Sequence, residues 1–161
     1  MQVIRLDTRI ALPTKEDGNA GYDLQAVALI EDDTNDRVPL ALYGNSTKLL
    51  RAGETIKFCT GLKIFIEDQN LVGLIFARSK LGANFGVVPA NCVGVIDSSY
   101  QGELIVALTN YSENTYKVKD MEKIAQLVIV PVYSPIFEEV SEFRTTTDRG
   151  ETGIMCEEQR K

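Results

Sequence analysis

Apolar and polar residues alternate with a period of two along most of this chain, and this alternation constrains the fold more than any other feature. In residues 55–66 the apolar side chains of one parity are Ile56, Phe58, Leu62, Ile64 and Ile66. Clusters of Gly, Asn and Asp separate this run from similar ones at 71–76, 103–108, 124–132 and 136–143. Many short strands with regular turn signals predict an all-β fold, either an antiparallel barrel or a sandwich.

The length of 161 residues is typical of one domain with a substantial core. We expect a single β domain over residues 1–148, in which only Ser79–Phe85 has the pattern of a short helical turn. Residues 31–49 begin with a polar run and predict a long loop excursion. Residues 149–161 carry Gly, Thr and charges without a strand pattern, and they predict a flexible C-terminal tail.

Charge and residue usage exclude several classes of function. The formal net charge is −6, and no Lys/Arg cluster offsets it, which argues against a nucleic-acid partner. The sequence contains no histidine. A Ser-His-Asp triad, a Cys-His dyad and an imidazole-ligated metal are therefore excluded, so a general base must be a carboxylate, a lysine, a tyrosine or a thiolate.

Cysteine usage and hydropathy bear on the compartment. Cys59, Cys92 and Cys156 are odd in number and form no CxxC pair, which is typical of reduced thiols rather than of a disulfide framework. The first ten residues lack the apolar core of a signal peptide. No apolar run approaches the roughly 18 residues needed to span a bilayer. We expect a cytoplasmic protein, or one in the host cytoplasm if it is viral, with no membrane partner.

Gly, Asp, Arg and Ser are unusually dense in five segments. These are AGYDL at 20–24, ARSKLG at 77–82, NCVGVIDSSYQGEL at 91–104, EKIAQL at 122–127 and TDRGETG at 147–153. Any one of them alone is more often a turn or an ordinary surface segment than a site. In this order, however, they resemble the five motifs of the trimeric dUTP pyrophosphatases (dUTPases). The resemblance runs from Ala20 to Gly153 and is best in the third and fourth motifs.

This resemblance implies a fold, an assembly and a reaction. The fold would be a jelly-roll-like β domain of the β-clip type, and the assembly a homotrimer with active sites where subunits meet. The reaction would be hydrolysis of dUTP to dUMP and pyrophosphate by Mg²⁺-assisted attack of water at the α-phosphorus. It would lower dUTP and supply dUMP for dTTP synthesis. Such chemistry depends mainly on positioning and charge neutralisation, so it does not require histidine.

The third motif would bind the nucleoside and activate water. By the resemblance, Asp97 is the carboxylate that aligns the attacking water, and an ionised Asp suits this role because it only accepts hydrogen bonds. Tyr100 would pack under the deoxyribose and leave no room for a 2′-hydroxyl. Without the motif, Tyr100 would be interpreted as a core aromatic beside a turn. The uracil edge would pair with main-chain groups of a hairpin, aided by one side-chain amide; the residues are Asn91, Gly94, Val95 and Ile96.

The other motifs would bind the triphosphate and the metal. The resemblance assigns phosphate contacts to Arg78, Ser79, Lys80, Gln126 and Arg149. Guanidinium groups suit phosphate because they can donate two parallel hydrogen bonds. Asp23 would hold the hydration shell of Mg²⁺ through water, and a single carboxylate suffices because Mg²⁺ keeps several waters. These cations and the metal would neutralise the substrate although the chain is acidic.

Three positions depart from the family pattern. Ser99 stands where many members carry a second Asp or a Gly, and this variable place is neutral. Lys80 stands where the family usually has Gly, and its ammonium could add a phosphate contact. In the fifth motif Ile154 replaces the expected aromatic residue, and residues 155–158 replace small ones. The tail would therefore act mainly through Arg149, and the role of residues 154–161 stays open.

Three alternatives compete with this interpretation. A dCTP deaminase shares the fold, but Ala107 stands at the place of its deaminating Glu, which argues against proton transfer there. A non-catalytic dUTPase-like protein that binds nucleotide and regulates a partner is compatible with the altered fifth motif and the 31–49 excursion. A generic β-sandwich binding protein is the remaining alternative.

Overall fold

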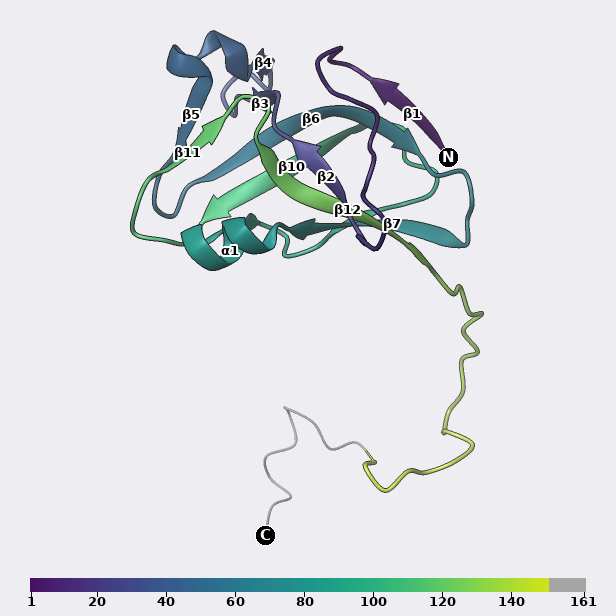
Figure 1. Ribbon diagram of the computed structural model, residues 1–161. Coiled ribbons are helices and arrows are strands. Elements are labelled where there is room, and N and C mark those ends of the chain that lie inside the picture. Colours follow the sequence, from purple (N-terminus) through teal and green to yellow (C-terminus); the bar gives the residue numbers. More distant parts are fainter. Residues whose placement is uncertain (151–161) are drawn as a thin grey trace.

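Antiparallel sheets form the fold of residues 1–150, the part of the chain that the computed structural model describes (Figure 1). One sheet contains β1 (Gln2–Arg5), β3 (Ala28–Ile30), β4 (Arg37–Pro39), β6 (Thr55–Phe65), β8 (Val87–Pro89) and β10 (Glu103–Asn110). A second contains β2 (Tyr22–Gln25), β7 (Leu71–Ala77), β9 (Gly94–Ile96) and β12 (Lys123–Pro131). A small third sheet pairs β5 (Thr47–Leu50) with β11 (Tyr116–Lys119). The prediction of an all-β fold is confirmed.

The core lies between the sheets and contains the side chains that the alternation of β6 predicted. Phe58, Leu62 and Ile64 of β6 are all at most 2% exposed. The middle of β6 is buried on both faces. β10 pairs along one edge of β6, and β1 and β3 pair along the other. The predicted strands at 55–66, 71–76, 103–108 and 124–132 are thus present, with boundaries shifted by a few residues. No helix in residues 1–150 is long and apolar enough to cross a membrane.

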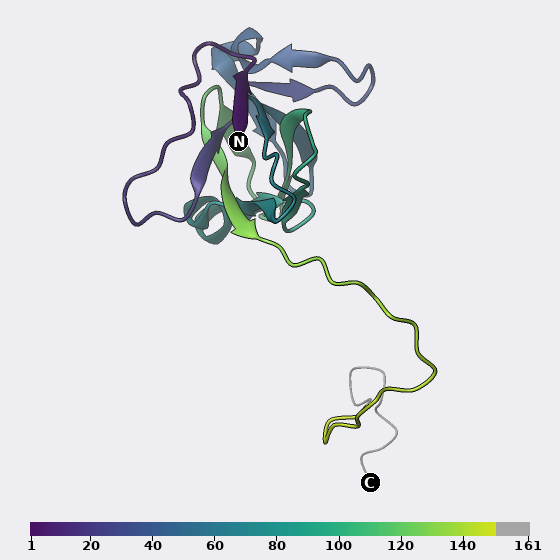
Figure 2. The same cartoon turned by 90° about the vertical axis from the view of Figure 1, so that its right-hand side faces the viewer.

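The strand predicted at 136–143 is wrong. Residues 132–150 have no regular secondary structure and lead away from the body after β12 (Figures 1 and 2). Their apolar side chains are open to solvent, with Ile136 97% and Phe137 92% exposed. The alternation is present in the sequence, but a strand also needs a neighbour for its main-chain N–H and C=O groups, and no strand of residues 1–150 pairs here.

Residues 31–49 are not the plain loop that the sequence predicts. Only the polar run at 31–36 forms a turn, and it closes the β3–β4 hairpin, which projects from the body in Figure 2. Two short 3-10 turns follow, η1 (Leu40–Leu42) and η2 (Gly44–Ser46), and then β5 begins. Leu40 is fully buried. These elements have three or four residues each, which is too short for a periodic pattern to be recognised.

The α-helix α1 (Ser79–Phe85) confirms the predicted helical turn and directs the second motif. Arg78 is extended and caps the helix at its N-terminus, so β7 leads straight into it. At the other end Gly86 has a φ of +64° and donates its N–H to the Gly82 carbonyl, which ends the helix in the left-handed conformation that favours glycine. Ser79 and Lys80 are thereby held at the end of the four-stranded sheet.

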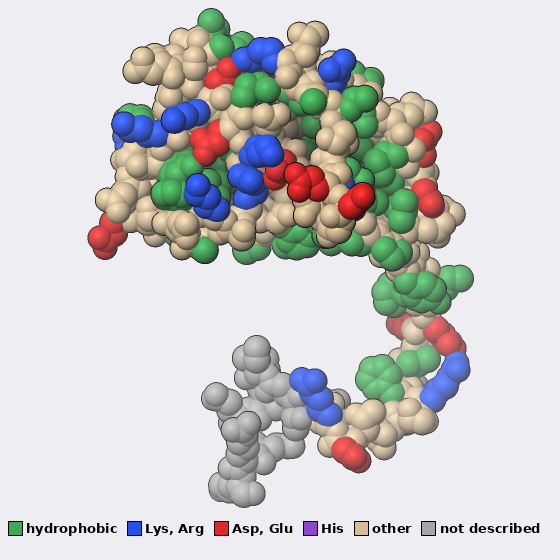
Figure 3. Space-filling view, in the orientation of Figure 1, with side chains coloured by type: hydrophobic (Ala, Val, Ile, Leu, Met, Phe, Trp, Pro, Cys, Tyr) green, Lys and Arg blue, Asp and Glu red, His purple; other side chains and the backbone are tan. Residues whose placement is uncertain are grey.

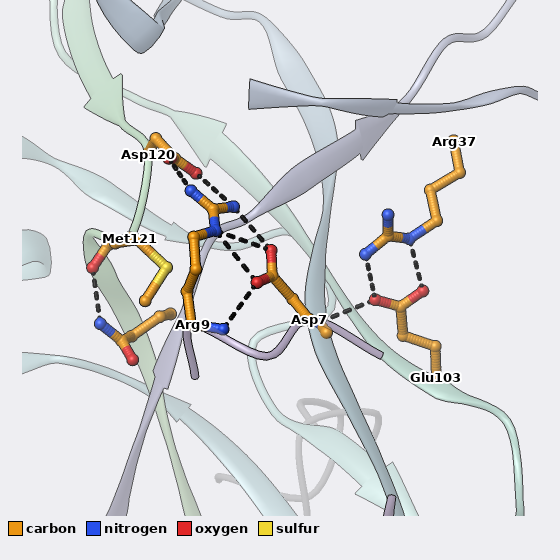
Figure 4. A network of polar contacts seen from close by, with 8 residues as sticks. Asp7, Arg9, Arg37, Glu103, Asp120 and Met121 are labelled. Carbon is orange, nitrogen blue, oxygen red and sulfur yellow. Dashed lines mark hydrogen bonds and ion pairs between the residues drawn. The ribbon is translucent and has the colours of Figure 1, made fainter. Parts of the chain in front are cut away.

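A network of ion pairs fastens the N-terminal segment and the β3–β4 hairpin to the body (Figure 4). The Arg9 guanidinium lies between Asp7 and Asp120 and holds the pKa of the Asp7 carboxyl below its usual range. Arg37 of β4 pairs with Glu103 of β10, and Glu103 also accepts the Gly61 N–H at 2.7 Å. The Gln25 amide donates to the Met121 carbonyl at 2.8 Å, which ties β2 to the start of β12.

Glu103→Gln is expected to destabilise the protein by about 1–3 kcal/mol. The Glu103 carboxylate is only 11% exposed and accepts hydrogen bonds from Arg37 at both oxygens and from the Gly61 N–H. The amide of Gln accepts at one terminal atom only, so donors are left without an acceptor. Urea unfolding followed by circular dichroism measures the change. Glu113→Gln is the control, since Glu113 is exposed. Equal stability of the two variants would contradict this role of Glu103.

The described cysteines, Cys59 and Cys92, are free thiols. Cys59 is fully buried in β6, and burial raises the pKa of its thiol to about 11. The thiol therefore stays protonated near neutral pH. Cys156 lies outside the described residues.

Candidate active site

The first, second and fourth motifs meet at one polar pocket of about 280 Å³. It is lined by Asn19, Ala20, Gly21, Asp23, Arg78, Ser79, Lys80 and Gln126. Figure 3 shows Lys and Arg side chains gathered beside acidic ones on this face of the body. The structure thus brings together five of the residues that the sequence predicted, namely Asp23, Arg78, Ser79, Lys80 and Gln126.

Strand pairing explains why these distant segments meet. Gln126 of β12 lies opposite Asp23 of β2 on one side and opposite Phe76 of β7 on the other. Arg78 and Ser79 come two and three residues after Phe76, where β7 passes into α1. An irregularity in the β2–β12 register between Lys123 and Ala125 brings Lys123 close to Asp23 as well.

The Asp23 carboxylate is held between two cations. Arg78 Nε lies 2.9 Å from Asp23 Oδ1, and Lys123 Nζ lies 2.8 Å from Asp23 Oδ2. Arg78 Nη1 also donates to the Lys123 carbonyl at 3.2 Å. The remaining N–H groups of the guanidinium are available for an anion, because guanidinium carries five donors and only two are used in these bonds. The pocket is therefore suited to phosphate.

Gln126 occupies the floor of the pocket in a defined orientation. Its Nε2 donates to the Ala77 carbonyl at 3.0 Å, and an amide nitrogen has a second hydrogen to offer to a ligand. Its Oε1 points toward Gly21, where a Cβ would lie only 2.7 Å from that oxygen. A methyl group at position 21 would therefore displace the Gln126 amide.

Gly21→Ala is expected to lower kcat/KM for the triphosphate substrate about tenfold, in line with the loss of one hydrogen bond to a charged group. The added methyl group would push the Gln126 amide from its place. Steady-state kinetics and a thermal melt would separate this effect from unfolding. Gly44→Ala is a matched control, because a Cβ at Gly44 meets no atom within 4 Å. Equal kinetics of both variants would argue against the proposed role of Gly21.

The third motif lies elsewhere in the same chain. β9 is at the opposite edge of the four-stranded sheet from β2, three strand positions or about 14 Å away. Asp97 follows Ile96, which pairs with Gly73, whereas Arg78 comes five residues after Gly73. Those five residues add about 16 Å along the strand. One chain therefore does not bring Asp97 to the pocket that contains Arg78.

The third motif leaves one edge of its strand open. β9 pairs with β7 only, so within residues 1–150 no strand pairs with its outer edge. A Cβ on Gly94 would lie 3.7 Å from Asn91 Nδ2, so the Asn91 amide lies beside the start of this strand. Val95 and Asn91 are exposed. The main-chain groups of β9 that face away from β7, together with the Asn91 amide, remain available for a ligand.

Asp97 and Tyr100 follow β9 on a tight turn. The Tyr100 N–H donates to the Asp97 carbonyl at 3.0 Å, and the Tyr100 hydroxyl donates to the Glu103 carbonyl at 2.9 Å. The ring lies across Gly102, where any Cβ would overlap it. Within residues 1–150, no hydrogen bond or ion pair engages the Asp97 carboxylate, which is exposed. Tyr100 is 41% exposed, so it is not the core aromatic of the alternative interpretation.

Arg149 does not line the pocket. It belongs to the extended segment after β12, and its side chain is exposed. The phosphate contact predicted for Arg149 therefore stays a prediction. The predictions for Ile154 and for residues 154–161 fall outside the described residues.

The pocket fits a hydrated divalent cation bound with a nucleotide, but not a metal held by protein ligands alone. Within residues 1–150 no group of three or more Cys, Asp and Glu side chains could hold a metal ion. Among the described residues that line the pocket, Asp23 is the only carboxylate. Each carboxylate oxygen accepts more than one hydrogen bond, so Asp23 can receive metal-bound water beside Arg78. This donor set matches Mg²⁺, which takes one carboxylate, substrate phosphates and several waters.

Sequence reasoning missed several residues of the pocket. It assigned no role to Lys123, Asn19, Ala20 or Gly21, which line it or reach its carboxylate. The sequence could have singled out Lys123, because it stands three residues before Gln126 in the fourth motif. Its approach to Asp23 depends on the irregularity in the β2–β12 register, which no local sequence pattern predicts.

Comparisons with known proteins agree with this site. A family model described as dUTPase matches residues 27–156. The deoxyuridine 5′-triphosphate nucleotidohydrolase of Hydrogenovibrio crunogenus is 41% identical over 153 residues, which cover 93% of this chain and 88% of the relative.

Solved structures agree as well. The Staphylococcus bacteriophage 80alpha dUTPase with dUpNHpp superposes with a TM-score of 0.74 at 25% identity, over 94% of both chains. A variant dUTPase of phage phi11 of S. aureus, which coordinates a structural Mg(II) ion, has a TM-score of 0.69 at 23% identity, over 89% of this chain and 98% of that one. The sequence match and the shared jelly-roll-like fold lead to one conclusion: the chain belongs to the dUTPase family.

Proposed function

We propose that this protein hydrolyses dUTP to dUMP and pyrophosphate with Mg²⁺, in active sites shared between the subunits of a homotrimer. One observation carries the proposal: a chain of the dUTPase family presents a cationic pocket and, at a separate place, an open strand edge, β9, followed by an exposed carboxylate. Neither half contains all the groups that the reaction needs.

The separation of the two halves supports the trimer. Arg78 and Asp97 would both act at the phosphate chain of one substrate, yet within one subunit they lie at opposite ends of the paired strands β7 and β9. A closed ring of identical subunits would place the edge of one subunit against the pocket of the next, so that every site is completed. The segment 132–150 leads away from the body after β12 (Figure 1), and in such an assembly it would contact a neighbouring subunit.

The pocket would bind the triphosphate. Arg78 and Lys80 supply positive charge, while Ser79 and the second N–H of the Gln126 amide supply further donors. Asp23 would hold Mg²⁺ through water, and the metal, when bound, neutralises the phosphate oxygens. These contacts offset the charge of the leaving pyrophosphate and keep the phosphate chain in one orientation.

Asp97 would align and deprotonate the attacking water. Its exposed carboxylate has no partner among the described residues, so an oxygen of Asp97 is available to accept a hydrogen bond from water. The water oxygen forms a bond to the α-phosphorus while the bond from that phosphorus to the bridging oxygen breaks. Pyrophosphate leaves with the bridging oxygen, and one proton passes to the Asp97 carboxylate.

Tyr100→Ala is expected to narrow the preference for dUTP over UTP about tenfold, because the ring that would lie beside the 2′-position is removed. The ratio of kcat/KM values for the two substrates measures it. Tyr100→Phe is the control, since it keeps the ring and removes only the hydroxyl that donates to the Glu103 carbonyl. An unchanged ratio in Tyr100→Ala would show that the ring does not guard the sugar.

A pyrophosphate-release assay tests the function directly. The wild-type protein with Mg²⁺ should release pyrophosphate from dUTP and give dUMP, and it should leave UTP and dCTP largely intact. Binding of dUpNHpp without any release of pyrophosphate from dUTP would instead favour a non-catalytic nucleotide-binding protein. Release of ammonia from dCTP would favour a deaminase.

A further inference from the structure

We propose that Lys123 acts as a stand-in cation at Asp23, and that its ammonium and Mg²⁺ compete for the same carboxylate. In the absence of nucleotide the lysine occupies Asp23 Oδ2, and it leaves when a metal-bound triphosphate enters. The lysine thereby sets the difference between the affinity for nucleotide with Mg²⁺ and the affinity without it. This inference rests on the proposed function and names a regulating residue of that same site.

The two cations at Asp23 are not held equally. Arg78 has two anchors, because Nε donates to Asp23 Oδ1 and Nη1 donates to the Lys123 carbonyl. The Lys123 ammonium makes one ion pair, with Asp23 Oδ2, and its side chain is 54% exposed against 34% for Arg78. An exposed ion pair of this kind is worth little, about 0–1 kcal/mol, and exchanges readily. Lys123 is therefore the cation that a metal would displace.

A second pocket gives the displaced ammonium a place to move. It has a volume of about 340 Å³ and shares Asn19, Gly21 and Asp23 with the polar pocket that contains Arg78 and Gln126. Lys123, Thr14, Lys15 and Glu16 complete its lining. Glu16 is its other carboxylate and offers Lys123 an alternative partner. Lys15 does not compete closely, because its ammonium lies over the Tyr22 ring, 5.4 Å from the centroid.

Charge balance explains why the lysine must yield. Asp23 carries −1 and its two partners carry +2, so this cluster has a net charge of +1 and repels a dication. Departure of Lys123 removes that repulsion. A unit charge about 5–6 Å from a dication in water changes the affinity for the metal roughly threefold to tenfold after screening by salt. The same positive charge favours a nucleotide that arrives without metal.

The test compares the binding of dUpNHpp in EDTA and in saturating Mg²⁺ by calorimetry. Lys123→Met should weaken metal-free binding and should lower the Mg²⁺ concentration needed for half-saturation, roughly threefold to tenfold. The dissociation constant of dUpNHpp in EDTA, divided by that in saturating Mg²⁺, should rise accordingly. Lys123→Arg, which keeps the charge, should retain the wild-type ratio. Glu16→Gln should raise the Mg²⁺ requirement, because the displaced ammonium loses its second partner.

Lys117→Met is the matched control, since it removes the same charge from an exposed position on β11. Equal metal dependence of Lys123→Met and Lys117→Met would overturn the proposal. A higher Mg²⁺ requirement in Lys123→Met would also overturn it, because Lys123 would then help to orient Asp23 for the metal. If wild-type protein hydrolyses dUTP while these results are negative, only this inference fails. If wild-type protein binds no dUpNHpp in either buffer, the proposed function fails and this inference falls with it.

Discussion

Asp97→Asn is expected to lower kcat for dUTP by at least about a hundredfold while the fold and the binding of dUpNHpp are retained. The carboxylate is exposed at the end of β9 and free of partners among residues 1–150, so its replacement disturbs no contact of the structure. An amide has a similar shape but cannot accept the proton from the attacking water. Single-turnover hydrolysis measures the chemical step, and calorimetry with dUpNHpp measures binding.

The control for Asp97→Asn is the same exchange on the projecting β3–β4 hairpin. Asp33→Asn removes one exposed carboxylate from the turn between the two strands, far along the chain from the third motif. It should leave kcat within about twofold of wild type, as is usual for surface substitutions. Wild-type turnover in Asp97→Asn would remove this residue from the mechanism. Loss of dUpNHpp binding would instead make Asp97 a binding residue.

Two inactive variants are expected to restore activity when they are combined in one assembly. Arg78→Gln disables the pocket and Asp97→Asn disables the third motif, and the two positions lie at opposite ends of the paired strands β7 and β9 in one subunit. If each site takes its pocket from one subunit and its third motif from another, random mixing gives intact groups in about one quarter of the sites. Co-expression with two affinity tags and sequential purification would isolate the mixed assemblies for assay.

Each variant purified alone is the baseline for this experiment, and activity should appear only in the mixture. A mixture of Asp97→Asn with Asp97→Gln provides the negative control, because every site then lacks the carboxylate. No recovery in the mixture of Arg78→Gln and Asp97→Asn would place both groups in the same subunit. A monomer by sedimentation at the concentration of the assay would exclude the shared site altogether.

Particular elements show how far the sequence determines this fold. The alternation in β6 fixes which side chains enter the core, because a strand turns successive residues to opposite faces whatever its neighbours are. The short helix α1 follows from its local pattern and ends at a glycine. The same reasoning fails at 136–143, where the alternation is present but no neighbouring strand is. It also misses β4, which has three residues.

The sequence supplies the side chains of the candidate site, whereas the tertiary structure decides which of them are brought together. The resemblance of the local motifs to those of the dUTPases singled out Asp23, Arg78 and Gln126, and all three line one pocket. Only the pairing of β2, β12 and β7 decided that these three meet and that Asp97 does not join them. Likewise the ion pair of Lys123 with Asp23 arises from a register irregularity between strands far apart in the chain. Strand order and register depend on contacts between remote segments, and a local pattern of residues cannot specify them.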